Sequence, residues 1–172
     1  MKLQLDANNQ VLLNTKRLLV DDRPTYTTGQ YAQGGIVVYT YNDGLNGFVI
    51  DLSGNTSGIV TWGCPGINIS TSAAILEGGN NTVNILALCY SPAAAYCTGL
   101  TSSGYNDWVM PSKDELTEIW NNRALLDSLS VNLWASGNQA SNSTAYYLRV
   151  SDGALISQSV GLTSRVRAIR YF

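Results

Sequence analysis

The most informative stretch of this 172-residue chain for its fold is residues 104–116, Gly-Tyr-Asn-Asp-Trp-Val-Met-Pro-Ser-Lys-Asp-Glu-Leu. Ser112 and Glu115 have the spacing of a capping box, in which the serine side chain accepts from a helical amide and the glutamate reaches back. The apolar residues of the next turns, Leu116, Ile119 and Trp120, recur at helical spacing. A helix is therefore expected from Ser112 to about Asn122.

Strands are expected after this helix. A further helical turn is predicted over Ala124–Leu129, and beyond it the pattern changes to short apolar runs typical of strands. The expected strands are Leu133–Ser136, Ala145–Val150, Ala154–Ser157 and Arg165–Phe172. Ser151-Asp152-Gly153 supplies a turn between the second and the third. Arg165 and Arg167 alternate along the last strand, so they are expected to face the same side.

A hairpin is expected upstream of the opening stretch. Ile36–Tyr41 and Gly47–Leu52 are apolar runs, and Asn42-Asp43-Gly44 between them contains the Asp-Gly pair typical of tight hairpin turns. Ile59–Gly63 is a candidate third strand. These runs place an antiparallel sheet in the first half of the chain.

Two helices are expected between this hairpin and the opening stretch. Asn80–Cys89 has helical periodicity, with Val83, Leu86 and Ala87 predicted on its buried face. Ser91-Pro92 reads as an N-cap followed by proline at the first helical position, so a second helix is expected over Ala93–Leu100. The chain is therefore expected to contain both helices and strands.

The first 33 residues differ from the rest of the chain. Leu3, Leu5, Val11, Leu13 and the run 18–20 suggest two or three short strands with little apolar mass. One interpretation is an extended arm over 1–33 that attaches a domain over 34–172 to a larger assembly or to sister subunits. The other is a strand pair that completes the domain's own sheet.

Composition excludes several classes of function. Charged residues make up 13% of the chain, about half the usual share, so the surface must rely on Ser, Thr, Asn, Gln and Gly. The net charge of −2 and the lack of a large Lys/Arg cluster argue against nucleic-acid binding. The chain has no histidine, which removes the commonest general base and excludes Ser-His and Cys-His nucleophile pairs.

The three cysteines leave two alternatives open. Cys64, Cys89 and Cys97 do not form a disulfide framework or a CxxC pair. One bridge with a free thiol and three buried thiols are both compatible with the sequence. The N-terminus lacks the apolar stretch of a signal peptide, and no segment reaches the length of a membrane span, so synthesis in a cytoplasm without membrane insertion is expected.

Six motifs, taken in order, resemble one family, that of the C-terminal domain of the Legionella collagen-like adhesin. They are Gly34–Tyr39, Trp62-Gly63-Cys64, Gly104–Trp108, Met110–Leu116, Leu133–Ser136 and Val166–Arg170. The resemblance covers about residues 34–172. The chain departs from the family's Tyr-Trp-Ser-Ser pattern at Leu133-Trp134-Ala135-Ser136, and from its usual residues before proline at Val109-Met110.

This resemblance implies an α+β, C-type-lectin-like fold with a twisted antiparallel sheet and two main helices. The family occurs in bacterial surface proteins and in bacteriophage structural proteins. It therefore implies a virion-associated protein of a phage head or tail fibre, trimeric by analogy with fibres. Residues 1–33 would contact other virion proteins, and the lectin-like face would bind a host-surface glycan or protein. A bacterial cell-surface adhesin is the alternative location.

Neither a metal nor acid–base chemistry is expected, and no cofactor is predicted. Asn106-Asp107 offers calcium-type oxygens, but the chain lacks the Glu-Pro-Asn or Gln-Pro-Asp triplet of calcium-dependent lectins. Local packing and pairing is therefore the preferred interpretation of these residues. Asp114 and Glu118 read as a solvated helix face near an N-terminus, where negative charge is favourable.

A polar stretch over 136–144, expected as an exposed loop, is the candidate ligand site. Its amides and hydroxyls can hydrogen-bond sugar hydroxyls, and flanking aromatic rings can stack on a sugar face. The candidate residues are Trp134, Ser136, Asn138, Gln139, Asn142 and Tyr146, with Arg149, Arg165 and Arg167 as a cationic rim for acidic glycans. The alternatives are a ligand-free hairpin and arginines that are solvated or paired with carboxylates.

Three functions follow as hypotheses. The first is a non-enzymatic adhesin or receptor-binding module, whose weak single-site affinity is multiplied by several copies. The second is a purely structural virion decoration or fibre protein without its own ligand. The third, an enzyme of the formylglycine-generating type, is disfavoured because the chain has no histidine and its C-terminal half has no recognisable pair of catalytic cysteines.

Overall fold

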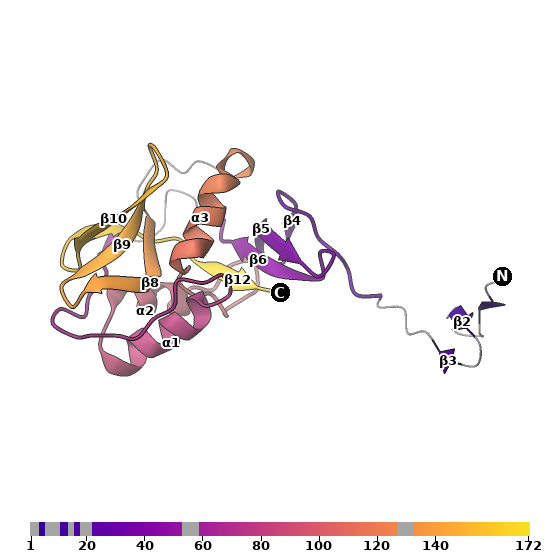
Figure 1. Ribbon diagram of the computed structural model, residues 1–172, viewed down its shortest axis with the longest axis horizontal. Coiled ribbons are helices and arrows are strands. Elements are labelled where there is room, and N and C mark those ends of the chain that lie inside the picture. Colours follow the sequence, from indigo (N-terminus) through magenta and orange to yellow (C-terminus); the bar gives the residue numbers. More distant parts are fainter. Residues whose placement is uncertain (1–3, 6–10, 14–15, 18–21, 53–58, 127–132) are drawn as a thin grey trace.

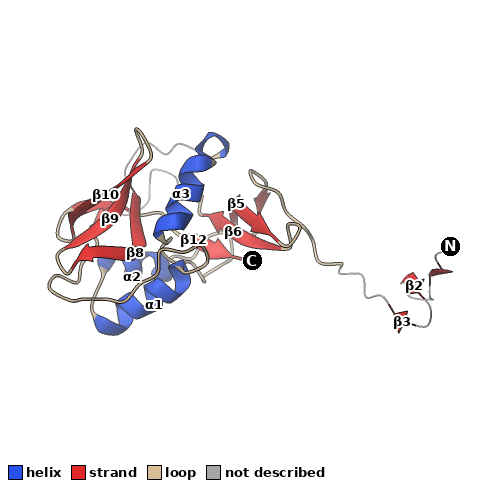
Figure 2. Ribbon diagram, viewed as in Figure 1, coloured by secondary structure: helices blue, strands red, loops and turns tan. Residues whose placement is uncertain are grey.

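The computed structural model describes residues 4–5, 11–13, 16–17, 22–52, 59–126 and 133–172, the last range with side chains from Gln139 onward. The described residues form a mixed α+β structure, with three α-helices and several antiparallel strand pairs (Figures 1 and 2). The described strands form a four-stranded, a five-stranded and a small three-stranded sheet. The α+β class is therefore confirmed.

The four-stranded sheet has the order β12-β6-β5-β4. Its strands are β4 (Tyr31–Ala32), β5 (Gly35–Tyr41), β6 (Asn46–Ile50) and β12 (Ile169–Tyr171). The predicted hairpin is confirmed as β5 and β6. Asn42, Asp43 and Gly44 in its turn all have positive φ, and at Gly44 an added Cβ would lie 2.5 Å from the carbonyl oxygen of Tyr26.

The five-stranded sheet has the order β10-β9-β8-β11-β7. Its strands are β7 (Ile59–Thr61), β8 (Leu133–Ser141), β9 (Thr144–Arg149), β10 (Ala154–Ser159) and β11 (Thr163–Arg165). The expected loop over 136–144 is wrong. Most of it is strand, because β8 continues to Ser141 and pairs with β9 through two register shifts, leaving only Asn142 and Ser143 in the turn.

The predicted last strand over 165–172 is also wrong, because the chain changes sheets within it. β11 pairs with β7 and β8, whereas β12 pairs with β6. Val166, Arg167 and Ala168 form the crossing between the two sheets and are buried. Arg167 therefore lies in the interior and not on a strand face beside Arg165.

Three helices cover the sheets: α1 (Gly78–Leu88), α2 (Pro92–Gly99) and α3 (Lys113–Asn121). The caps predicted from sequence are confirmed. Ser91 accepts from the amide of Ala94, with Pro92 at the first helical position. Ser112 and Glu115 form both halves of a capping box at the start of α3. A 3₁₀ turn over Arg123–Leu125 follows α3, and residues 127–129 of the expected extra turn lie outside the described residues.

The predicted buried face of α1 is wrong. Val83 is 65% exposed and Leu86 37% exposed, whereas Asn81, Thr82 and Ile85 are buried. Thr82 donates to the carbonyl of Gly78 and accepts from the amide of Met110. Asn81 bonds both backbone groups of Ser72. Polar residues occupy the inner face because loops packed against α1 need hydrogen-bond partners there.

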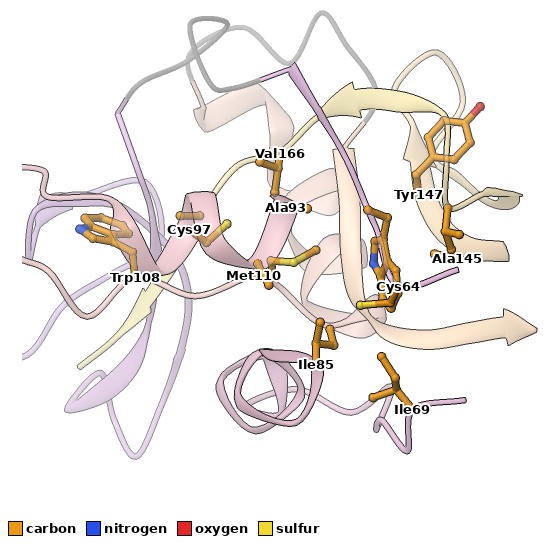
Figure 3. Packing of buried hydrophobic residues seen from close by; sticks show 14 of the residues in the cluster. Cys64, Ile69, Ile85, Ala93, Cys97, Trp108, Met110, Ala145, Tyr147 and Val166 are labelled. Carbon is orange, nitrogen blue, oxygen red and sulfur yellow. The ribbon is translucent and has the colours of Figure 1, made fainter. Parts of the chain in front are cut away.

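The interior contains two clusters of apolar side chains. The larger collects residues from α1, α2, β7 and β9 around Trp62, Trp108 and Met110, and Figure 3 shows several of them together. The smaller packs Leu116 and Ile119 of α3 against the hairpin β5–β6. The predicted packing of Trp108 is confirmed, since its side chain is 1% exposed.

One disulfide joins Cys64 to Cys89, and Cys97 is a free, buried thiol. This is the first of the two alternatives left open by the sequence. Burial raises the pKa of the Cys97 thiol well above its ordinary value of 9.0. The bridge links the loop after β7 to the residue that follows α1.

The N-terminal third sheet consists of β1 (Gln4–Leu5), β2 (Val11–Leu13) and β3 (Lys16–Arg17). Its described strands pair only with one another. Residues 26–33, in contrast, pack on the domain. The Tyr26 ring lies edge-on to Phe172 with centroids 5.1 Å apart, and β4 pairs with β5. The hydrogen-bonded domain therefore begins before the predicted boundary at residue 34.

Glu115 connects α3 to the loop before α1 and to the C-terminal strand. Its fully buried carboxylate accepts hydrogen bonds from the amides of Ser112 and Leu76 and from the Tyr171 hydroxyl, at 2.6, 2.8 and 2.7 Å. Burial raises the pKa of the Glu115 carboxyl above its ordinary 4.5, and the hydrogen bonds oppose this only in part. Burial and the nearby Glu115 also raise the pKa of Tyr171.

The raised pKa of Glu115 predicts a pH-dependent stability. The folded protein retains the proton of the Glu115 carboxyl at pH values where the unfolded chain has released it. The stability that this proton contributes is therefore fully present below about pH 4.5 and is lost as the pH rises through the pKa of the folded state. The wild type should therefore lose stability relative to Glu115→Gln between acidic and neutral pH. Urea unfolding of both proteins measures this, with Glu118→Gln as the control for removing a carboxylate from α3. A difference that stays constant with pH would contradict the assignment.

Candidate functional site

A groove of about 500 Å³ lies between the segment after the disulfide loop and the end of β8. Its lining residues carry amide, hydroxyl and aliphatic side chains and no charge; they are Asn68, Ile69, Ser70, Gln139, Ala140 and Ser141. The volume lies in the range of small-molecule sites, about 300–1,000 Å³. The groove can therefore accept an uncharged polar ligand.

Gln139 holds the two walls of the groove together. Its Oε1 accepts from the amide of Ile69 at 2.9 Å, and its Nε2 donates to the carbonyl of Ile67 at 3.0 Å. Beside it, the amide of Gly66 donates to the carbonyl of Asn142 at 2.7 Å. The predicted ligand residue Gln139 thus uses both ends of its amide within the protein, and its role is to position the wall.

The wall is also fixed from the side of α1 and the disulfide. Asn81 bonds the amide and the carbonyl of Ser72 at 2.8 and 2.6 Å, and Asn84 donates to the carbonyl of Ser70. At the other end, the amide of Ile67 bonds the carbonyl of Cys64, which carries the bridge to Cys89. The groove is therefore preformed, which lowers the entropic cost of binding.

Hydroxyl groups of the β8–β9 turn border the groove. The hydroxyl of Ser141 lies 3.1 Å from that of Ser143 and 2.9 Å from that of Thr144. The predicted residue Asn142 is exposed in this turn, next to the lining residue Ser141. Hydroxyls can both donate and accept, so this border can exchange its own hydrogen bonds for bonds to a ligand.

Three predicted site residues share β8 with the groove. Trp134, Ser136 and Asn138 lie on this strand, but their side chains are outside the described part of the chain. Tyr146, on β9, is half-buried, and the ammonium of Lys113 lies 4.6 Å from its ring centroid. One face of the Tyr146 ring is therefore already occupied by a cation.

The predicted cationic rim does not hold for Arg167. This side chain is 2% exposed and pairs with Asp51, the Nε–Oδ1 distance being 3.2 Å, so it cannot reach a surface ligand. Arg149 is exposed and forks onto Asp152 at 2.8 and 2.5 Å. This hydrogen bond lowers the pKa of the Asp152 carboxyl below 3.8. Arg165 ends β11 and is half-buried. Arg149 therefore fits the alternative of arginines paired with carboxylates.

Asn68 and Ser70, which form one wall of the groove, were not among the site residues predicted from the sequence. A signal was present, because residues 66–70 place polar Asn68 and Ser70 alternately with apolar Ile67 and Ile69 after a Pro-Gly turn. This segment is not a strand in the structure, but Ile69 is buried and its polar neighbours are exposed. Ile67 is also exposed, so only Ile69 anchors this segment to the core.

Asp107 pairs with a residue distant in sequence, not with a local one. Its Oδ1 accepts from the Nε of Arg170 at 2.5 Å. Among the described residues, no group of three or more His, Cys, Asp or Glu could hold a metal ion. No described helix has the length and apolar character needed to cross a membrane. The sequence matches no protein-family model and no curated protein.

Proposed function

We propose that this chain is a non-enzymatic recognition protein whose C-type-lectin-like domain binds a host-surface glycan or protein. In this proposal it is part of a bacteriophage virion, as a head or tail-fibre protein, and its trimeric assembly multiplies a weak affinity. The observation that carries the proposal is the uncharged, preformed groove between Asn68–Ser70 and the β8–β9 hairpin. Neutral sugars present many hydroxyls and no charge, which matches this lining.

The disulfide supports a location outside the cytoplasm. Disulfides persist in oxidising surroundings and are rare in the cytosol, and the Cys64–Cys89 bridge fixes one end of the groove wall. A virion surface and a bacterial cell surface, which is the alternative location, both provide such surroundings. In either place, the groove would meet ligands in its oxidised, fixed form.

A purely structural protein is the second candidate. The sheet β1–β3 favours it, because strands of two or three residues are too short to be stable alone and need a partner. We propose that other virion proteins supply this partner to the segment 1–33. The two candidates are compatible in one molecule and differ in whether the groove has a ligand.

A glycan array probed with the full chain tests the recognition function, with Asn68→Ala as the decisive variant. Asn68 lines the groove and is exposed, so its loss should leave the fold intact and weaken glycan binding about tenfold. Asn121→Ala, which removes an exposed amide from α3, is the matched control and should bind as the wild type does. Glycan binding unaffected by Asn68→Ala would place the ligand elsewhere, and an array without any bound glycan would leave the structural candidate.

A further inference from the structure

A second pocket lies beside the four-stranded sheet and shares no lining residue with the groove. It encloses about 230 Å³ and is lined by Arg23, Pro24, Tyr26, Gln33, Leu45, Arg170 and Phe172. Figure 1 shows the C-terminus next to β12 and β6. Arg170 lies on β12, and Phe172 follows this strand. The lining combines two guanidinium groups with aromatic and aliphatic side chains, unlike the uncharged groove.

The guanidinium of Arg170 is held rigidly at this pocket. It lies over the Tyr105 ring, 3.8 Å from the centroid. Its Nε donates to Asp107 at 2.5 Å, and its Nη1 donates to the side-chain and backbone oxygens of Gln33 at 3.2 and 3.4 Å. A cation fixed by three neighbours loses little conformational entropy when it binds a ligand.

The Nη2 of Arg170 is the donor group left for a ligand. Among the described residues nothing accepts a hydrogen bond from it, while Nε and Nη1 are both engaged. The Arg170 side chain is 13% exposed, so it is in part accessible to solvent. Its two N–H groups are therefore available to an acceptor in the pocket.

The backbone conformation of Gln33 is a second observation that favours a binding role for this pocket. It has φ of +53° in the turn between β4 and β5, a conformation that glutamine adopts at a cost. Its amide donates to the Tyr26 hydroxyl at 2.8 Å and accepts from Arg170. Glycine would suit this turn better, but it would leave Tyr26 and Arg170 without their common partner.

The remaining walls are apolar and aromatic. Tyr26 and Phe172 meet edge to face, with an interplanar angle of 80°, and Pro24 and Leu45 add aliphatic surface. Such walls fit the apolar face of a ring, while the free Nη2 of the guanidinium fits one anionic oxygen. The volume is below the range of drug-sized sites, so one ring fills it.

We propose that this pocket binds a single acidic sugar unit, a pyranose ring that carries a carboxylate. The carboxylate accepts from the Nη2 of Arg170, and the sugar ring lies against Tyr26 and Phe172. Because Nε and Nη1 are engaged, one carboxylate oxygen accepts a charge-assisted hydrogen bond from Nη2. The apolar walls select an organic ring over a small inorganic anion. The pocket is separate from the groove, so this assignment does not depend on the proposed function.

The test uses three probes on the full chain: methyl glucuronide, methyl glucoside, which lacks the charge, and acetate, which lacks the ring. Backbone-amide NMR shifts report both the affinity and the place of binding. Methyl glucuronide should shift the amides of residues around Tyr26, Leu45 and Phe172, and should bind about tenfold more tightly than either other probe. Shifts confined to other parts of the protein, equal affinities for the three probes, or no shifts would each overturn the proposal.

Two variants assign the effect to the pocket. Arg170→Lys keeps the charge but cannot bond Asp107 and Gln33 and also offer a fixed donor to the ligand, so it should weaken the binding of methyl glucuronide about tenfold. Gln33→Gly relieves the turn and removes the amide, so it should weaken binding while the unfolding midpoint stays the same or rises. Arg123→Lys, on the turn after α3, is the control and should bind like the wild type. Asn68→Ala should also leave this affinity unchanged. Unaltered affinity in both pocket variants would overturn the assignment.

Discussion

Asp51→Ala is expected to destabilise the protein by about 3–5 kcal/mol, because it leaves the buried guanidinium of Arg167 without its counter-charge. The side-chain exposures of Arg167 and Asp51 are 3% and 1%, so water cannot replace the lost carboxylate. Asp51 also accepts from the amide of Ala168 and, through its carbonyl, from the Nη2 of Arg167. A typical domain has only about 5–15 kcal/mol of stability, so this one change should remove a large share.

Chemical unfolding of a small set of variants measures this effect. Asp51→Asn keeps an acceptor oxygen without the charge and should cost less than Asp51→Ala. Arg167→Met, alone and combined with Asp51→Ala, completes a double-mutant cycle, in which the double variant should lose less than the sum of the singles. Asp152→Ala breaks the exposed pair with Arg149 and should leave the midpoint nearly unchanged. A loss below about 1 kcal/mol for Asp51→Ala would show that water reaches Arg167.

Removal of the Cys64–Cys89 bridge is expected to lower the free energy of unfolding by about 3.5 kcal/mol, which is the second large effect. The two residues are 25 positions apart, and closing a loop of that length in the unfolded chain accounts for this amount in the chain-entropy model. Urea unfolding with and without a thiol reductant measures the loss. Cys64→Ala/Cys89→Ala should be less stable by a similar amount and should not respond to the reductant.

Cys97→Ala provides the control for the cysteine chemistry. This buried thiol takes no part in the bridge, so its removal should leave the response to reductant as large as in the wild type. A wild-type protein whose stability does not change on full reduction would contradict the entropic role of the bridge. Because the bridge fixes one end of the groove wall, reduction should also weaken glycan binding if the groove is the ligand site.

Local features of the fold could be predicted from sequence because they depend on near neighbours. The capping box of Ser112 and Glu115, the Ser91-Pro92 helix start and the Asn42-Asp43-Gly44 turn each satisfy their backbone partners within a few residues. In such cases, residue type and spacing determine the backbone conformation. The α+β class was expected from the family resemblance, and the structure confirms it.

Non-local partners explain what could not be predicted. The inner face of α1 is polar because Asn81 binds a loop nine residues away. Arg167, at the sheet crossing, is buried because it pairs with Asp51, 116 residues away in the sequence. At the candidate site, Gln139 lines the groove and Asn142 lies in the turn next to it. Gln139, however, bonds the backbone about 70 residues upstream, and only the structure shows that its amide is already engaged.

The crossing of the C-terminal segment between the sheets has a consequence for synthesis of the protein. β12 pairs Ile169 with Ile50, so the edge of β6 remains uncovered until residues 169–171 have left the ribosome. Until then the hairpin β5–β6 has an open edge, and Asp51 lacks the counter-charge of Arg167. Slow, long-range closure of this kind exposes the nascent chain to mispairing with its neighbours. The domain therefore matures only after residues 167–171 have been synthesised.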